Sequence, residues 1–350
     1  MSSEAVSKSS DHDRYASNNA TDVAIEDELF IAKIANDFTH IETKKVREIH
    51  SILHSAELFL RDKWAESSFQ SASELKLESW FTGLHKNFDF LCTLQEVEVE
   101  WFAGVEKKQS NIPTIMPMVV SISLMLIALD GSRQPLLIEH VDKAITQCHP
   151  AVFMYSIQEN DDRLQHTLLA YICVQKQHSM STSYQTMFLI FLHQIFYKGS
   201  VLVDMFKHDL IMVPLMLRSL QLMTSDFDCF KEECEKFRNM VSSCQLRLHH
   251  DTVTTECKLK SATLIIREAL NGCKGPASSK NTRLITLPDK MDSLQSGEID
   301  PLQGEFQMAH VVACFKEFRK SFKTGKVNSI VKLLDRIVGL LETEEVVAVV

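Results

Sequence analysis

The chain has 350 residues, of which 45% are hydrophobic and 24% charged, which is enough apolar content for one extended core or two domains. Its formal net charge of −9 disfavours electrostatic binding of the whole surface to nucleic acid or to an anionic membrane. Only 10 glycines and 8 prolines are present, which argues against the glycine-rich turns of most nucleotide-binding and α/β catalytic folds.

The N-terminal stretch, residues 1–23, is rich in Ser, Asn and Asp and has few apolar side chains, so we expect a disordered tail there. It has neither the apolar centre of a secretory signal nor the Arg-rich amphipathic pattern of a mitochondrial one. The nine cysteines are odd in number, and most lie inside apolar periodic segments, which is typical of reduced thiols. We therefore expect the protein in the cytoplasm or nucleus.

Residues 24–108 are expected to form an N-terminal helical segment. Apolar side chains recur at steps of three and four from Phe38 to Leu60, which places them on one helix face. After a loop, a second helical block is expected over about residues 74–108. The end of that block, residues 97–102 (VEVEWF), also alternates like a strand, but no partner strand is visible nearby.

Residues 109–271 are expected to form a central array, because apolar segments of about 10 to 20 residues alternate with breaks there. The most apolar run, Ile115–Leu129, contains Pro117 and is shorter than the roughly 20 residues of a membrane span. We expect it to be a buried helix, with no membrane insertion. Asp226 is expected to cap the helix that follows it. The breaks are predicted at residues 130–135, 149–150, 159–162, 178–183, 198–200, 224–226 and 249–252.

Residues 272–304 are expected to be a flexible loop, because four glycines and three prolines fall within this stretch. Two further helices are predicted over about residues 305–322 and 327–341. We expect this C-terminal unit, residues 305–350, to pack on the array, with the apolar end VVAVV docked on the body.

The segment His208–Met223 (HDLIMVPLMLRSLQLM) resembles the last two helices of an armadillo-type repeat. In such repeats an Ile-x-x-Pro-like start leads into a Leu-rich inner helix, and Ile211, Pro214 and the leucines after them fill that pattern. Asp209 stands near the place of the usual turn glycine. The resemblance to the armadillo/HEAT superfamily covers at most residues 111–270. It implies an all-α array with an extended, curved surface of the kind that binds other proteins.

Catalytic and metal-binding motifs are missing from the sequence, which has no phosphate-binding glycine loop, no H-E-x-x-H and no C-x-x-C. The densest group of possible zinc ligands has four and nine residues between successive cysteines, unlike the usual zinc pairs. On a helix, residues five apart also diverge by about 140°. We expect ordinary thiols and histidines, with no metal and no cofactor, at these positions: Cys229, Cys234, Cys244, His249, His250 and Cys257.

Other polar residues allow an enzymatic interpretation as an alternative. Cys148 with His149 and Cys173 with His178 are close in sequence, but adjacent helix residues point about 100° apart, so the first pair does not face each other. We interpret both pairs as core thiols beside boundary histidines, since a dyad needs mutual hydrogen-bond reach. A dispersed active site would use side chains near helix ends, where capping and surface groups are the ordinary occupants: His193, Asp204, His208 and Asp209.

Basic and aromatic side chains alternate near the C-terminus. Phe315, Phe318 and Phe322 are spaced as a core stripe, which leaves the charges on a solvated face. The alternative is a patch for nucleic acid or for an acidic partner, although such footprints normally cluster more basic groups. The candidate partner-binding residues are Lys316, Arg319, Lys320, Lys323 and Lys326.

Helical patterning without a catalytic constellation predicts a non-enzymatic intracellular scaffold or adaptor that binds other proteins. Two alternatives stay open. One is a regulatory subunit that is stable only within a larger complex, with the nucleus as a candidate location. The other is an enzyme with a dispersed helical active site.

Overall fold

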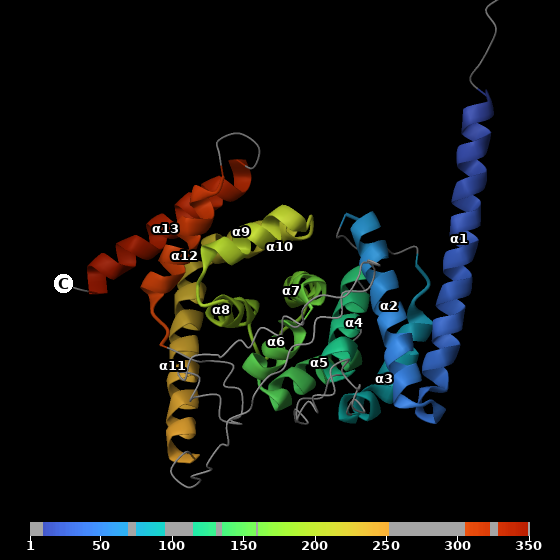
Figure 1. The fold of residues 1–350 in the computed structure, drawn as a ribbon, viewed down its shortest axis with the longest axis horizontal. Coiled ribbons are helices and arrows are strands. Elements are labelled where there is room, and N and C mark those ends of the chain that lie inside the picture. Colours follow the sequence, from blue (N-terminus) through green and yellow to red (C-terminus); the bar gives the residue numbers. More distant parts are fainter. Residues whose placement is uncertain are drawn as a thin grey trace, which may run out of the picture.

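The computed structural model describes residues 10–68, 75–94, 115–130, 135–158, 160–251, 305–322 and 328–348. Within these ranges, side chains are described from residue 25 onward, except at residues 243–251, 328 and 344–348. These residues form 13 α-helices and one 3-10 helix, and no strand occurs among them, so the expected all-α class is confirmed (Figure 1). The helices are α1 Ser10–Thr39, η1 Ile41–Thr43, α2 Val46–Glu66, α3 Glu78–Thr93, α4 Ile115–Asp130, α5 Pro135–Cys148, α6 Pro150–Gln158, α7 Asp161–Gln175, α8 Tyr184–Gln194, α9 Gly199–His208, α10 Met212–Ser225, α11 Phe227–Asp251, α12 Met308–Lys320 and α13 Asn328–Ala348.

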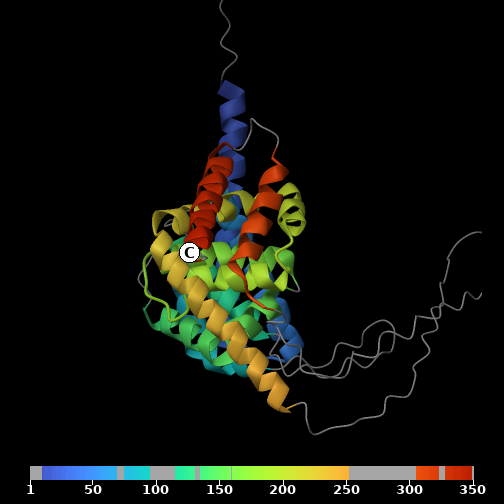
Figure 2. The ribbon, with the colours of Figure 1, turned by 90° about the vertical axis from the view of Figure 1, so that its left-hand side faces the viewer.

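The helices form an array of two stacked rows. In one row, α2, α4, α7, α10 and α13 contact one another in turn, and in the other, α1, α3, α5, α6, α8 and α11 do so (Figures 1 and 2). Contacts between the rows join α3 to α4, α4 to α5, α6 to α7, α7 to α8 and α10 to α11. The N-terminal helices therefore continue the array, while the armadillo/HEAT repeat type stays a prediction.

Helix α4 is the centre of the array. All of its residues except Ala128 and Asp130 are buried, as expected for a helix that is apolar on every side. Its two buried hydroxyls are satisfied: Thr167 of α7 donates to Ser121 at 2.8 Å, and Ser123 donates to the carbonyl of Val119 at 2.8 Å. The expected interior helix is confirmed. No single described helix is long and apolar enough to cross a membrane; α8 and α9 pass that test only together, with a bend of 105° between them.

A buried ionic cluster links α2 to α7, the two row neighbours of α4. Glu57, with no exposed surface, accepts hydrogen bonds from Arg61 at 2.7 Å and from two nitrogens of Arg163 at 2.8 Å each. Burial by itself would raise the pKa of Glu57, but the hydrogen bonds and charges of Arg163 and Arg61 outweigh it and hold the pKa below its ordinary value. The helical periodicity of the sequence does not predict the contact between Glu57 and Arg163.

The N-terminal helices differ from the sequence prediction in two ways. Helix α1 begins at Ser10, inside the stretch expected to be disordered. The apolar face expected to run unbroken from Phe38 to Leu60 belongs to two helices, because the chain turns at η1. Both ends of that face are nevertheless buried. Residues 97–102 and the loop 272–304 lie outside the described residues.

Most predicted breaks coincide with helix ends, including α5 to α6, α6 to α7 and α10 to α11. The predicted cap at Asp226 is confirmed, because its carboxylate accepts a hydrogen bond from the backbone N–H of Cys229 at 3.2 Å. The last helix, α13, continues to Ala348, seven residues past the predicted end at Leu341.

The turn after α8 has two successive non-glycine residues with left-handed backbone, Phe196 and Tyr197, each at φ 54°. The N–H of Tyr197 donates to the carbonyl of Leu192 at 2.8 Å, and the N–H of Phe196 to that of His193 at 2.9 Å, which is the Schellman pattern. Phe196 has φ 54°, where glycine is usual, and its side chain is 64% exposed. A bulky residue thus occupies a costly backbone conformation at an exposed corner.

Candidate functional site

A cavity forms a groove between α3 and α5. It has a volume of about 530 Å³, and α4 and the start of α6 contribute to its floor. We call it the α3–α5 groove. Its floor is apolar and rich in sulfur, whereas its rim carries charged and amide side chains. The lining residues are Phe88, Asp89, Cys92, Thr93, Met116, His140, Lys143, Ala144, Gln147, Cys148 and Val152.

One wall of the α3–α5 groove is set by His140. Its Nδ1 lies 3.5 Å from a carboxylate oxygen of Asp89, and its ring packs against those of His85 and Phe88, with centroids 5.1 and 5.3 Å away. These contacts join α3 to α5 through side chains that also line the groove. The imidazole of His140 thus packs against α3 and forms part of the groove wall.

The two groove thiols are poor nucleophiles. Burial raises the pKa of Cys92 to about 12, with a further contribution from the charge of Asp89, and burial raises the pKa of Cys148 as well. Both side chains are therefore neutral thiols at pH 7 and act as small, polarisable apolar groups. This arrangement suits contact with an apolar side chain better than covalent chemistry.

The Cys–His pairs considered from the sequence have other contacts. His149, at φ 72°, accepts a hydrogen bond through Nδ1 from the backbone N–H of Ala151 at 3.3 Å, in the turn between α5 and α6. Cys173 accepts one from Arg218 at 2.7 Å. Burial raises the pKa of Cys173 despite the nearby charges of Arg218 and Lys176. The thiols of Cys148 and Cys173 both have raised pKa values, whereas a nucleophilic thiol requires a lowered one.

Three of the four residues considered for a dispersed active site have separate partners. His193 is buried on α8, with Nδ1 2.9 Å from the hydroxyl of Tyr197. Asp204 pairs with Lys207 at 3.6 Å, and Asp209 accepts a hydrogen bond from Gln165 at 2.6 Å. His208 is exposed at the end of α9. None of these three pairings joins two of the four residues to each other.

Within the described residues, no group of three or more His, Cys, Asp or Glu side chains could hold a metal ion. Of the residues considered as zinc ligands and expected to be ordinary thiols and histidines, Cys229 is half-buried and Cys234 is buried on α11. Burial raises the pKa of both thiols, that of Cys234 to about 12. Cys244, His249 and His250 lie where side chains are not described, and Cys257 lies outside the described residues.

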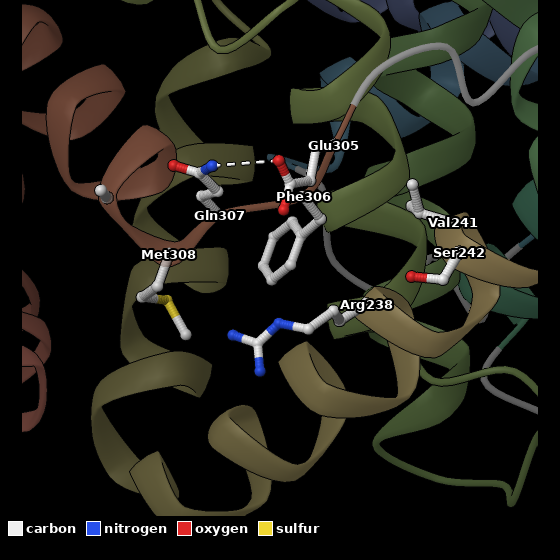
Figure 3. Close-up of a pocket in the computed structure, with 8 residues that line it drawn as sticks. Arg238, Val241, Ser242, Glu305, Phe306, Gln307 and Met308 are labelled. Carbon is white, nitrogen blue, oxygen red and sulfur yellow. Dashed lines mark hydrogen bonds between the residues drawn. The ribbon is translucent and has the colours of Figure 1, made fainter. Parts of the chain in front are cut away.

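A second cavity, of about 370 Å³, lies where the chain enters α12 (Figure 3). Phe306 points into it toward the guanidinium of Arg238, 5.9 Å from the ring centroid. Arg238 also binds both carboxylate oxygens of Glu235, at 2.7 and 2.6 Å, and Gln307 donates to Glu305 at 3.2 Å. Because these polar groups already pair with one another, the cavity offers little for a ligand to bind.

The predicted C-terminal basic residues take part in contacts between α12 and α13. Lys316 pairs with Glu342, and Arg319 binds both oxygens of Asp335, at 2.8 and 3.3 Å. Two of the five cations are thus balanced by acidic partners, which weakens this face as an anion-binding patch. Lys320 is exposed on α12, and Lys323 and Lys326 lie outside the described residues.

Sequence reasoning missed the α3–α5 groove because its walls come from separate parts of the chain. The available signal was a cysteine on each of two predicted helices, with the apolar helix Ile115–Leu129 between them in the chain. This signal did not distinguish a groove from a core. Comparison of the chain with models of known families, with curated proteins and with solved structures finds no match.

Proposed function

We propose that the protein is a non-enzymatic scaffold or adaptor that binds a segment of another protein in the α3–α5 groove. The occupant would present an apolar side chain to the floor formed by Phe88, Met116 and the two thiols. Asp89 and Lys143 on the rim offer one charge of each sign to the flanking residues of such a segment. The groove is the single observation on which the proposal rests.

Several features support binding over catalysis at this position. The thiols are held neutral by burial, and His140 is engaged with Asp89 and two aromatic neighbours. Methionine and cysteine sulfur atoms adapt to differently shaped apolar groups, as is common on protein-binding surfaces. We place the protein in the cytoplasm or nucleus, on the strength of its cysteine usage.

A photo-crosslinking experiment tests the proposal. A benzophenone amino acid at Gln147, on the groove rim, is expected to crosslink a partner in cells, whereas the same group at Ala313, exposed on α12, is not expected to crosslink that partner. The variant Ala144→Trp, which fills the groove, should abolish the crosslink, and Ala313→Trp should preserve it. A crosslink that survives Ala144→Trp, or none from the rim, would contradict the assignment.

A regulatory subunit that is stable only in a larger complex is the second candidate. It is favoured by apolar side chains on the outward face of α1, where Ile25 is 51% exposed and Leu29 is 67% exposed. Under this alternative the purified chain should aggregate alone and recover on co-expression with its partner. A well-behaved monomer whose stability is unchanged by Leu29→Ser would count against it.

A further inference from the structure

The C-terminal hairpin, α12 with α13, is seated on a surface formed by α9 and α10. Helix α12 contacts α9, α13 contacts α10, and the two hairpin helices contact each other. The centre of this interface is aromatic: Phe206 of α9 lies 5.8 Å from Phe318 and 5.1 Å from Phe322, between ring centroids. Without the hairpin, this part of α9 would be exposed to water.

At the start of α9, the interface with α12 combines a hydrogen bond with a close approach of the two backbones. The backbone N–H of Gly199 donates to the carboxylate of Glu317 at 2.8 Å, which places an acidic group at the N-terminus of α9. A Cβ at Gly199 would lie 2.5 Å from the carbonyl oxygen of Cys314 and 2.8 Å from the nitrogen of Phe318. Only a residue without a side chain allows the two backbones to approach this closely.

The segment leading into α12 adds an anchor. Phe306 is 2% exposed, and its ring centroid lies 5.1 Å from that of Phe237 on α11 and 6.4 Å from that of Tyr197. His310 of α12 also packs on Tyr197, at 5.3 Å. The segment from Phe306 to α13 therefore contacts the array along its length, through α9, α10, α11 and Tyr197.

The hairpin is joined to the array by residues 252–304, a connection of about 53 residues between Asp251 and Glu305. An extended chain spans up to about 3.3–3.6 Å per residue, so covalent linkage does not restrict the hairpin to its own array. We propose that the α9–α10 surface is a docking site for the α12–α13 hairpin of a second copy of this chain, so that two copies can exchange hairpins.

Mass action sets when the exchange is visible. A tether keeps the hairpin's own docking surface at a high effective concentration, which falls as the tether lengthens. The wild-type chain is therefore expected to be monomeric at micromolar concentration. Exchange becomes dominant when docking within one chain is blocked, since identical helices then find their surface on another copy.

Two full-length variants isolate docking between copies. Gly199→Leu blocks the α9 surface but keeps its hairpin intact, and Phe318→Asp disables the hairpin but keeps its α9 surface intact. Each variant alone is expected to be a monomer by native mass spectrometry, and the mixture at about 50 μM is expected to give a 1:1 complex. As a control, a double variant that carries both Gly199→Leu and Lys320→Asp is mixed with the Phe318→Asp variant. Because Lys320 is exposed on α12, this mixture should still give the 1:1 complex.

A mixture that contains only monomers would overturn the proposal. Because either variant could lose its fold, a second measurement uses the wild-type chain with a protease site inserted within residues 252–304. After cleavage, the hairpin fragment should remain bound at micromolar concentration and exchange with an isotope-labelled copy within hours to days. Dissociation of the fragment on cleavage, or no exchange over days, would also overturn it.

Discussion

Replacing Glu57 by Gln is expected to destabilise the fold strongly at neutral pH. The change keeps the size of the side chain but removes the negative charge between Arg61 and Arg163, whose side chains are only 8% and 13% exposed. Arg163 would then stay largely withdrawn from water without its counter-charge, and Arg61 would keep only the exposed carboxylate of Asp162, 3.7 Å away. The link between α2 and α7, on either side of α4, would be weakened at the same time.

The magnitude follows from the geometry. Glu57 accepts three short hydrogen bonds from guanidinium groups, at 2.7, 2.8 and 2.8 Å. Removing one member of a buried ion pair costs about 3–5 kcal/mol, because the remaining charge is desolvated and unpaired. For a chain of 350 residues, that loss corresponds to a fall in Tm of roughly 4–7 °C.

Acidification gives the decisive comparison. The folded pKa of Glu57 is held below its ordinary value, so its contribution to stability is complete above the unfolded value of about 4.3 and is lost as pH falls through the folded pKa. The gap between wild type and Glu57→Gln should therefore be full at pH 7 and should shrink below about pH 4. Urea unfolding followed by circular dichroism measures the gap. Both proteins should carry His54→Gln, since His54 lies 3.9 Å from Glu57.

The matched control is Glu48→Gln, which removes the same charge from an exposed position of the same helix. It should change the free energy of unfolding by less than about 0.5 kcal/mol. A loss below about 1 kcal/mol for Glu57→Gln at pH 7 would refute the reasoning, given the usual cost of breaking a buried pair. So would a gap that acidification leaves unchanged.

Three further substitutions have defined outcomes. Gly199→Ala should lower the free energy of unfolding by about 1–3 kcal/mol in denaturant titrations, because its Cβ would meet backbone atoms of α12; an unchanged midpoint would show that the two helices separate freely. Phe196→Gly should raise Tm, because a non-glycine residue in the left-handed conformation costs about 1–2 kcal/mol. The greater conformational freedom of glycine in the unfolded state offsets part of this gain. A lower Tm would mean that the exposed ring of Phe196 is packed. Glu233→Gln should destabilise at pH 7 by about 1–2 kcal/mol, because its carboxylate accepts from Thr186 at 2.6 Å; equal stability of both proteins at pH 7 would contradict this role.

The groove and the buried cluster show why part of the site could not be predicted from the sequence. The sequence places Cys92 and Cys148 on predicted helices, each among apolar and polar residues. Only the packing of α3 beside α5 brings the two thiols to the same cavity. Glu57 and Arg163 are 106 residues apart, and each is an ordinary charged residue in its own helix. Charge pairing at that separation leaves no periodic signal.

Local features followed from the sequence alone because they depend on neighbours within a few residues. The 3.6-residue periodicity predicted the all-α class and the buried faces, the unbroken apolarity of Ile115–Leu129 predicted an enclosed helix, and Asp226 predicted a cap. The tertiary structure alone decided which helices became neighbours: that α2 and α7 flank α4, and that Gly199 admits α12. Such choices depend on the fit between surfaces distant in the chain, and residue spacing within one helix carries no record of that fit.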